Sequence, residues 1–289
     1  MTHHLFYRRS LVVTFENASL FDKSCRFGLR VLCVAVLVFL VLPVLIIIPL
    51  SFNGGSFLTF PLEGVSLRWY RQLFASDNWV MAIRNSFLIA AITTVIATSL
   101  GTAAAIGMQR LPGKIKTCLQ LFIASPVIVP VIISATGLYF LYAPVGLNNS
   151  LAGMVLSHTM LAVPFVVVTV ASTLEGFDMN LMRAAASSGA APIVAFRRVM
   201  LPLISPGVIS GAVFAFAVSF DDIVMAIFLA GPQQRTIPLQ MFNGVREEIN
   251  PTIAAAATIL VILSIFLLSA VEYLKHRARS MKAGASGDQ

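Results

Sequence analysis

The chain has 289 residues, of which 58% are hydrophobic and only 11% are charged, and its formal net charge is +8. Soluble proteins carry about 25% charged residues, so this composition excludes an ordinary soluble domain and indicates a membrane protein with several spans. No loop between the apolar runs is long enough for a large globular domain, so a soluble catalytic domain is expected only on another chain.

Six charge-poor apolar runs approach the roughly 20 residues that a membrane-spanning helix requires. They predict an all-α fold with six transmembrane helices, at residues 31–52, 86–108, 118–142, 151–173, 206–230 and 252–271. The predicted organisation is a cytoplasmic N-terminal segment (1–30), a transmembrane domain (31–274) and a cytoplasmic C-terminal tail (275–289).

The positions of the Lys and Arg residues predict the orientation of the chain across the membrane, because short cytoplasmic loops are enriched in these residues. With a cytoplasmic N-terminus, all but five of the 20 Lys and Arg residues fall in predicted cytoplasmic segments; the five are Arg68, Arg71, Arg84, Arg235 and Arg246. Both termini and the loop at 181–202 are therefore expected in the cytoplasm. The same bias explains the positive net charge without any binding of nucleic acid.

Residues 66–86, between the first and second predicted spans, form an amphipathic segment. Trp69, Leu73 and Val80 recur near helical spacing, and Trp and Tyr favour the headgroup zone, so we expect a helix on the outer surface. This helix is either an interfacial anchor or a contact for a binding protein. The second span is rich in small residues, which let transmembrane helices approach closely, so we expect it inside the bundle.

The third and fourth predicted spans carry aromatic and polar residues. The third ends in an aromatic cluster that includes Tyr139. This cluster either forms an interfacial belt or lines an outer vestibule, and Tyr139 is a candidate pathway residue. The fourth contains His158, for which we expect hydrogen bonds inside the bundle rather than a bound metal. The three cysteines have no metal-ligand spacing either, so no metal site is predicted.

A polar-tolerant loop follows the fourth span. Residues 181–202 read LMRAAASSGAAPIVAFRRVMLP. Alanine favours helix, Gly189 permits a sharp turn, and Pro202 is expected to stop a helix ahead of the next one. The pattern predicts a short helix–turn–helix whose small-residue surface lets the backbone of a partner approach closely.

Asp221 and Asp222 are the only acidic residues well inside a predicted span. A carboxylate there costs about 3 kcal/mol on insertion scales and marks a pathway or a pairing site by default. Helical spacing places Asp222 on a small, polar stripe with Ser219, and Asp221 on a bulkier face. We therefore assign Asp222 to the pathway and Asp221 to packing; the alternative is that a partner subunit satisfies both. Ser219 and Asp222 also have the spacing of a capping box, which would break the helix near Ser219.

The loop at 181–202 resembles the EAA loop of binding-protein-dependent ABC importer permeases. The family pattern is Glu-Ala-Ala, three residues, Gly, nine residues, an aliphatic residue, any residue and Leu-Pro. The residues that match it are Ala184, Ala185, Gly189, Leu201 and Pro202, whereas Arg183 stands where the family has Glu. In that family the loop docks in a cleft of the ATPase subunit, so the resemblance implies a coupling role for these six positions.

The region of the fifth span more narrowly resembles the spermidine/putrescine-type branch of this family. The matching residues are Ser219-Phe220-Asp221-Asp222, Gly231-Pro232 and Thr236-Ile237-Pro238-Leu239, and the resemblance extends over about residues 31–272. It implies the type I ABC importer permease fold, with Ser219, Asp221 and Asp222 as candidate substrate contacts. It also implies a second homologous permease subunit, two ATPase subunits that bind ATP and Mg, and an extracytoplasmic solute-binding protein.

These observations predict a permease subunit of the bacterial inner membrane, surrounded by lipid, that forms half of a pathway for a polyamine or a related amine. The chain is not expected to be an enzyme or to bind a cofactor, because it lacks the phosphate-binding pattern Gly-x-x-x-x-Gly-Lys. The alternatives are an ABC permease for a different small solute, an ion-coupled secondary carrier that uses Asp221 and Asp222, and a membrane scaffold. The lack of a detectable inverted repeat disfavours the carrier, and two Asp residues in a span disfavour the scaffold.

Overall fold

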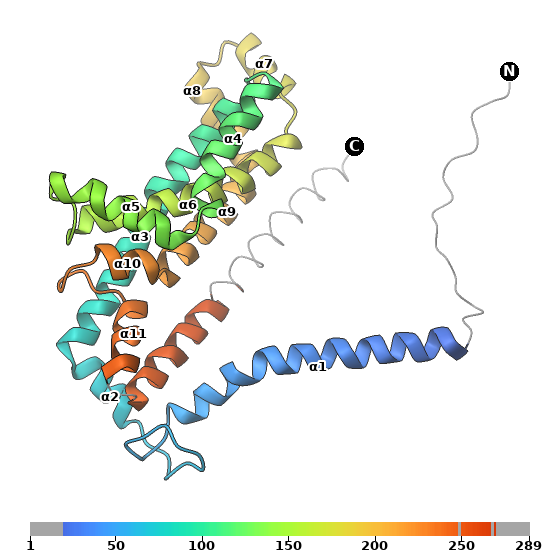
Figure 1. Ribbon diagram of the computed structural model, residues 1–289. Coiled ribbons are helices and arrows are strands. Elements are labelled where there is room, and N and C mark those ends of the chain that lie inside the picture. The colour runs from blue at the N-terminus through green and yellow to red at the C-terminus, as the bar shows by residue number, and fades with distance from the viewer. Residues whose placement is uncertain (1–19, 248–249, 267–268, 270–289) are drawn as a thin grey trace. The chain divides into compact units, whose positions relative to one another are not determined.

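The computed structural model describes residues 20–247, 250–266 and 269, and it divides the chain into two compact units, Met1–Ile47 and Ile48–Gln289. The described residues are helices and connecting loops, with one isolated antiparallel bridge between Asn53 and Val65. The elements are α1 (Leu20–Leu50), α2 (Arg68–Ala75), α3 (Asp77–Met108), α4 (Gly113–Ile128), α5 (Val131–Tyr142), η1 (Ala143–Val145), α6 (Leu151–Glu175), α7 (Asn180–Ser187), α8 (Pro192–Ala195), η2 (Phe196–Met200), α9 (Leu201–Asp221), α10 (Val224–Leu229) and α11 (Ile237–Glu247), followed by an apolar helix over Pro251–Phe266 (Figure 1).

The described part of the first unit is a single helix, because residues 20–47 all belong to α1. The helix begins at Leu20, earlier than the predicted start of the first span at residue 31. Its side chains are exposed from residue 27 to residue 46. An apolar helix of this length without a packed core of its own is suited to a lipid environment.

Four helical segments in the described part of the chain are long and apolar enough to cross a membrane: Phe27–Leu50, Asp77–Met108, Leu151–Glu175 and Pro192–Asp221. They correspond to the first, second, fourth and fifth predicted spans. The sixth predicted span is helical over Pro251–Phe266, and residues 267, 268, 270 and 271 of that span lie outside the described residues. The predicted count of six is therefore not confirmed.

The third predicted span, at 118–142, is broken into two helices. α4 and α5 meet at an angle of 95°, and together they count as at most one further span. Pro130 explains the break, because the residue before a proline is disfavoured in the α conformation. Val129 is accordingly extended, with φ −72° and ψ 134°.

The centre of the second unit is formed by α3, α6 and α9. The fully buried alanines on these helices include Ala97, Ala105, Ala162 and Ala215. Gly101 on α3 lies against Val166 on α6, and Gly211 on α9 lies against Thr169; a Cβ atom at either glycine would be 2.7 Å from its neighbour's side chain. Small residues thus let the three helices approach closely, which confirms the predicted interior position of the second span.

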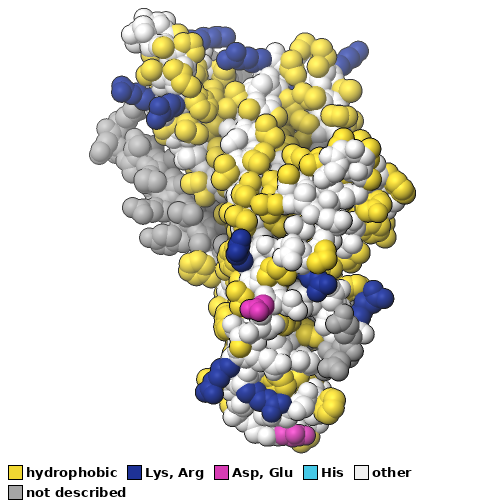
Figure 2. All heavy atoms as spheres, turned by 90° about the vertical axis from the view of Figure 1, so that its left-hand side faces the viewer, with side chains coloured by type: hydrophobic (Ala, Val, Ile, Leu, Met, Phe, Trp, Pro, Cys, Tyr) yellow, Lys and Arg dark blue, Asp and Glu magenta, His cyan; other side chains and the backbone are white. Residues whose placement is uncertain are grey.

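The basic loops predicted to be cytoplasmic lie at one end of the second unit. Figure 1 places the turn between α3 and α4 beside α7 and α8, and Figure 2 shows Lys and Arg side chains gathered at that end. The exposed basic residues of these segments include Arg110, Lys114, Arg183, Arg197 and Arg198. α2 and α11 lie toward the opposite end (Figure 1). The two basic loops therefore face the same side of a membrane that the bundle crosses.

The predicted amphipathic helix at 66–86 is shorter than expected. α2 ends at Ala75, and Asp77 already belongs to α3. Trp69 and Leu73 are buried in the second unit, and the Trp69 Nε1–H donates to the Asn53 carbonyl oxygen at 2.7 Å. This bond ties α2 to the loop that follows α1.

Candidate functional site

The fifth predicted span is interrupted at its acidic pair. α9 ends at Asp221 and α10 begins at Val224, and Asp222 between them is extended, with φ −70° and ψ 123°. The capping-box pattern suggested a break near Ser219, but α9 continues through Ser219 and the break comes three residues later. Ser219 and Asp222 still lie on the same side of α9, because both contact the ring of His158 on α6. The predicted helical stripe ends at Asp222, beyond which the chain leaves the helix.

Asp222 caps the helix that follows it. The Met225 N–H donates to Asp222 Oδ2 at 2.9 Å, so the carboxylate satisfies an amide in the first turn of α10 that has no partner within the helix. The side chain of Asp222 is 10% exposed. A negative charge in an apolar span is thus held in place at the point where the helix breaks.

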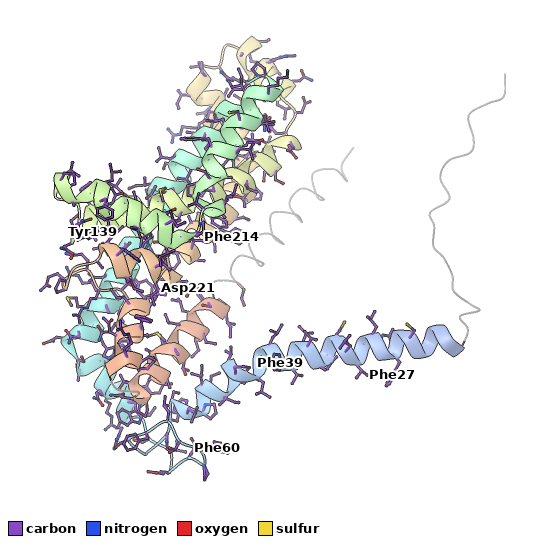
Figure 3. All side chains as sticks on the ribbon, viewed as in Figure 1. Phe27, Phe39, Phe60, Tyr139, Phe214 and Asp221 are labelled. Carbon is purple, nitrogen blue, oxygen red and sulfur yellow. The ribbon has the colours of Figure 1, made fainter. Side chains whose placement is uncertain are left out.

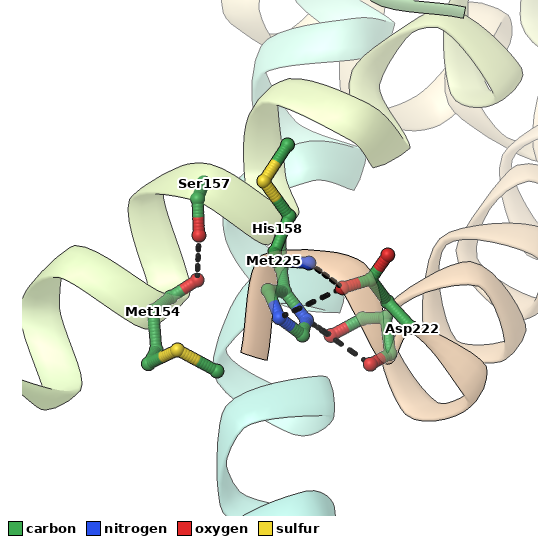
Figure 4. A network of polar contacts seen from close by, with 6 residues as sticks. Met154, Ser157, His158, Asp222 and Met225 are labelled. Carbon is green, nitrogen blue, oxygen red and sulfur yellow. Dashed lines mark hydrogen bonds and ion pairs between the residues drawn. The ribbon is translucent and has the colours of Figure 1, made fainter. Parts of the chain in front are cut away.

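His158, on α6, lies against the same break. Its side chain is fully buried, and its Nδ1 is 3.0 Å from the Ser219 carbonyl oxygen and 2.9 Å from Ser219 Oγ. Its Nε2 is 3.8 Å from Asp222 Oδ2, as Figure 4 shows. We call these three residues the His158–Ser219–Asp222 network. The hydrogen-bonded interior histidine is confirmed, but sequence reasoning missed its partner, which lies 61 residues away.

The other candidate pathway residues lie outside this network. Asp221, the last residue of α9, is exposed rather than packed, and Figure 3 labels it there. The expectation that Asp221 faces a packed, bulky surface is therefore not met within the described chain. Tyr139, on α5, is 43% exposed, and its ring meets that of Phe140 edge-on, with centroids 5.7 Å apart.

The loop after α10 is hydrogen-bonded to the N-terminal part of α3, at Asn85 and Ser86. The Asn85 side-chain amide donates to the carbonyl oxygens of Gln233, at 2.8 Å, and Arg235, at 3.0 Å. Ser86 Oγ accepts from the Ile237 N–H at 2.8 Å, at the start of α11. Sequence reasoning missed this connection, although the Gly-Pro and Ile-Pro loop was noted. A polar Asn-Ser pair at the entrance of an apolar run was the available signal.

The first half of the loop at 181–202 ends in a Schellman motif. The Ala190 N–H donates to the Ala185 carbonyl oxygen at 3.1 Å, and the Gly189 N–H donates to that of Ala186 at 2.9 Å. This pair of bonds needs a left-handed residue after the helix, and Gly189 has φ +80°. The predicted helix–turn–helix is therefore confirmed, and Gly189 supplies its turn.

The second half of this loop differs from the prediction. Pro192–Asp221 is one helical segment, so Pro202 does not stop a helix. Proline clashes with the carbonyl four residues earlier in a regular α-helix. Here the preceding turn, Phe196–Met200, is π-helical, and this wider turn accommodates the proline.

The residues that match the family pattern lie largely on the surface of the loop. Ala184 and Gly189 are exposed, and Ala185 and Leu201 are half-buried. Arg183 is exposed and donates to Asn180 Oδ1 at 3.3 Å, and within the described residues it forms no ion pair. No cluster of three or more possible metal ligands occurs in the described part of the chain.

Residues 97–280 match the family of binding-protein-dependent transport system inner membrane components. The chain belongs to this family. This permease is 33% identical over 256 residues to the spermidine/putrescine transport system permease protein PotC of Escherichia coli (strain K12), an alignment that covers 88% of this chain and 95% of PotC. It is 35% identical over 232 residues to the putrescine transport system permease protein PotI of the same organism, covering 77% of this chain and 81% of PotI.

The fold of this permease is that of type I ABC importers. A bacterial ABC transporter involved in the import of the acidic polysaccharide alginate matches with a TM-score of 0.68, over 89% of this chain and 98% of that chain. The sequence identity is only 14%, so this likeness concerns the fold alone.

Proposed function

We propose that this permease forms half of the translocation pathway of an ABC importer for polyamines of the spermidine and putrescine type, or for a related small amine. The observation that carries the proposal is the Asp222 carboxylate, held at a helix break inside an apolar span. A carboxylate attracts a cation far more strongly where water is scarce. The names of PotC and PotI support polyamines as the substrate class.

The proposed pathway includes Ser219, Asp221, Asp222 and Tyr139. A polyamine carries more than one ammonium group, and consecutive carboxylates at the end of α9 offer it two negative charges. The exposed ring of Tyr139 adds an aromatic face, which attracts cations. Ser219 contributes indirectly, because its hydroxyl contacts His158, whose ring also lies against Asp222.

The proposed complex contains a second homologous permease subunit, two ATPase subunits and an extracytoplasmic solute-binding protein. ATP and Mg bind to the ATPase subunits, which dock on the loop at 184–202. Its exposed small residues and its Gly189 turn support this role. Both termini and this loop lie in the cytoplasm, in agreement with the Lys and Arg distribution.

Reconstituted vesicles test the proposal. The full complex, with its binding protein outside and ATP supplied to the ATPase subunits, is given labelled spermidine, putrescine or a neutral disaccharide. We expect ATP-dependent uptake of the amines alone, unaffected by ionophores. Uptake of only the disaccharide would overturn the substrate class. Amine uptake that ionophores abolish while ATP is present would instead indicate an ion-coupled carrier.

A further inference from the structure

The end of α9 leaves a backbone acceptor in need of a donor. In a continuous helix the Ser219 carbonyl oxygen would accept from the N–H four residues later, at Ile223. Asp222 is extended, so the helical ladder stops before that bond forms. Buried carbonyl groups are almost always paired. Here His158 supplies the donor from α6, with Nδ1 3.0 Å from the oxygen.

The pairing of the Ser219 carbonyl depends on which ring nitrogen of His158 carries hydrogen. A carbonyl oxygen only accepts hydrogen bonds, so Nδ1 must carry hydrogen for this contact to pair the free carbonyl group. The Ser219 hydroxyl, 2.9 Å from the same nitrogen, can accept from it as well or donate to it in the other tautomer. Nε2 is buried without a hydrogen-bond partner among the described residues, and it attracts a carboxylate only when it carries hydrogen as well. It faces Asp222 Oδ2 at 3.8 Å. One imidazole thus contacts the last turn of α9 and the carboxylate that caps α10.

We propose that His158 is a positioning residue for transport: it stabilises the break between α9 and α10 and thereby fixes the place at which the Asp222 carboxylate meets the solute. This inference rests on the proposed role of Asp222 in transport. His158 is itself fully buried, so it acts through Asp222 rather than on the solute. Groups that bind a substrate work best when buried neighbours hold them in position.

Which ring nitrogen of His158 carries hydrogen can be measured without any solute. Nitrogen-15 NMR of the purified permease with labelled histidine reports which ring nitrogen is protonated, and His158→Asn identifies the signal by its loss. We expect hydrogen on Nδ1, whether the ring is neutral or doubly protonated. A neutral ring with hydrogen only on Nε2 would overturn the inference, because the Ser219 carbonyl would then lack its donor.

Three substitutions test the positioning role in reconstituted vesicles. Asparagine places an amide N–H near the position of Nδ1, glutamine places one near Nε2, and leucine provides none. We expect His158→Asn to keep the initial uptake rate within about threefold of the parent, and His158→Gln and His158→Leu to lower it by about tenfold or more. Co-purification of the subunits measures assembly, and we expect it to be unchanged while the apparent KM for the solute rises.

A double substitution asks whether His158 acts through Asp222. Adding His158→Leu to Asp222→Asn should cause little further loss, because residues that act as one unit are not additive. The inference would be overturned if His158→Leu lowered uptake as much in the Asp222→Asn background as in the parent, or if His158→Leu alone kept the parental uptake rate. Equal loss of uptake in His158→Asn and His158→Leu would overturn it as well. If His158→Leu does not assemble, comparing the uptake rates of His158→Asn and His158→Gln tests the positioning role instead.

The proposed substrate and the proposed role of His158 fail separately. A parent complex that carries no amine would refute the proposed substrate, while the NMR result would still test the contact with Ser219.

Discussion

At the scale of single residues, Asp222 combines a charge with a helix cap, and two substitutions separate them. Asparagine caps a helix about as well as aspartate, whereas alanine costs about 1 kcal/mol. We therefore expect Asp222→Asn to keep the thermal stability of the purified permease and Asp222→Ala to lower it. Both should strongly reduce amine uptake in vesicles. Uptake by Asp222→Asn equal to the parent would remove Asp222 from the pathway.

Gly189 offers a test of coupling. Its φ of +80° is strained for a β-branched residue but is tolerated by asparagine. Gly189→Val should remain in the membrane but lose solute-stimulated ATP hydrolysis by the assembled complex, and Gly189→Asn should retain most of it. Normal stimulation in the valine variant would rule out a coupling role for this turn.

Arg183 reverses the charge that is usual at its position in the family pattern, and its only described polar partner is Asn180. We expect it to meet a carboxylate on the ATPase partner, so Arg183→Glu should reduce co-purification of that subunit and Arg183→Lys should not. An Arg183→Glu permease that assembles and transports better than the parent would contradict an acidic partner.

At the scale of elements, two glycines of α3 form a matched pair. A Cβ at Gly101 would lie 2.7 Å from Val166, whereas one at Gly107 meets nothing within 4 Å. Gly101→Ala should therefore destabilise the permease by about 1–3 kcal/mol through overpacking. Gly107→Ala should stabilise it by up to about 1 kcal/mol through helix propensity. Thermal unfolding in detergent makes the comparison, and equal shifts would contradict the close packing of α3 on α6.

The sequence predicted the helices better than their interruptions. Apolar runs identify helices because the membrane requires them, and the Gly189 turn follows from local geometry. Pro130 was visible, but a proline in a span kinks or breaks it according to its neighbours, so the 95° bend could not be derived. The partner of His158 could not be derived either, because a contact across 61 residues depends on how α6 and α9 pack.

At the scale of the whole molecule, orientation is the property still to be tested. In a variant without Cys25, Cys33 and Cys118, single cysteines at Thr59 and Ser187, both exposed, report the two sides. We expect a membrane-impermeant thiol reagent to label Thr59→Cys in intact spheroplasts, and Ser187→Cys only after the membrane is opened. The reverse pattern would place the loop at 184–202 outside and exclude its contact with a cytoplasmic ATPase.

The π-helical turn at Phe196–Met200 holds one residue more than an α-helical turn. A π-helix rotates less per residue than an α-helix, because each hydrogen bond spans five residues rather than four. The five residues of this turn therefore cover about the same rotation as four α-helical residues. Deleting one residue here would restore a regular α-helix with little change in the direction of the Gly189 turn, whereas the same deletion inside α9 would rotate that turn by about 100° around the helix axis.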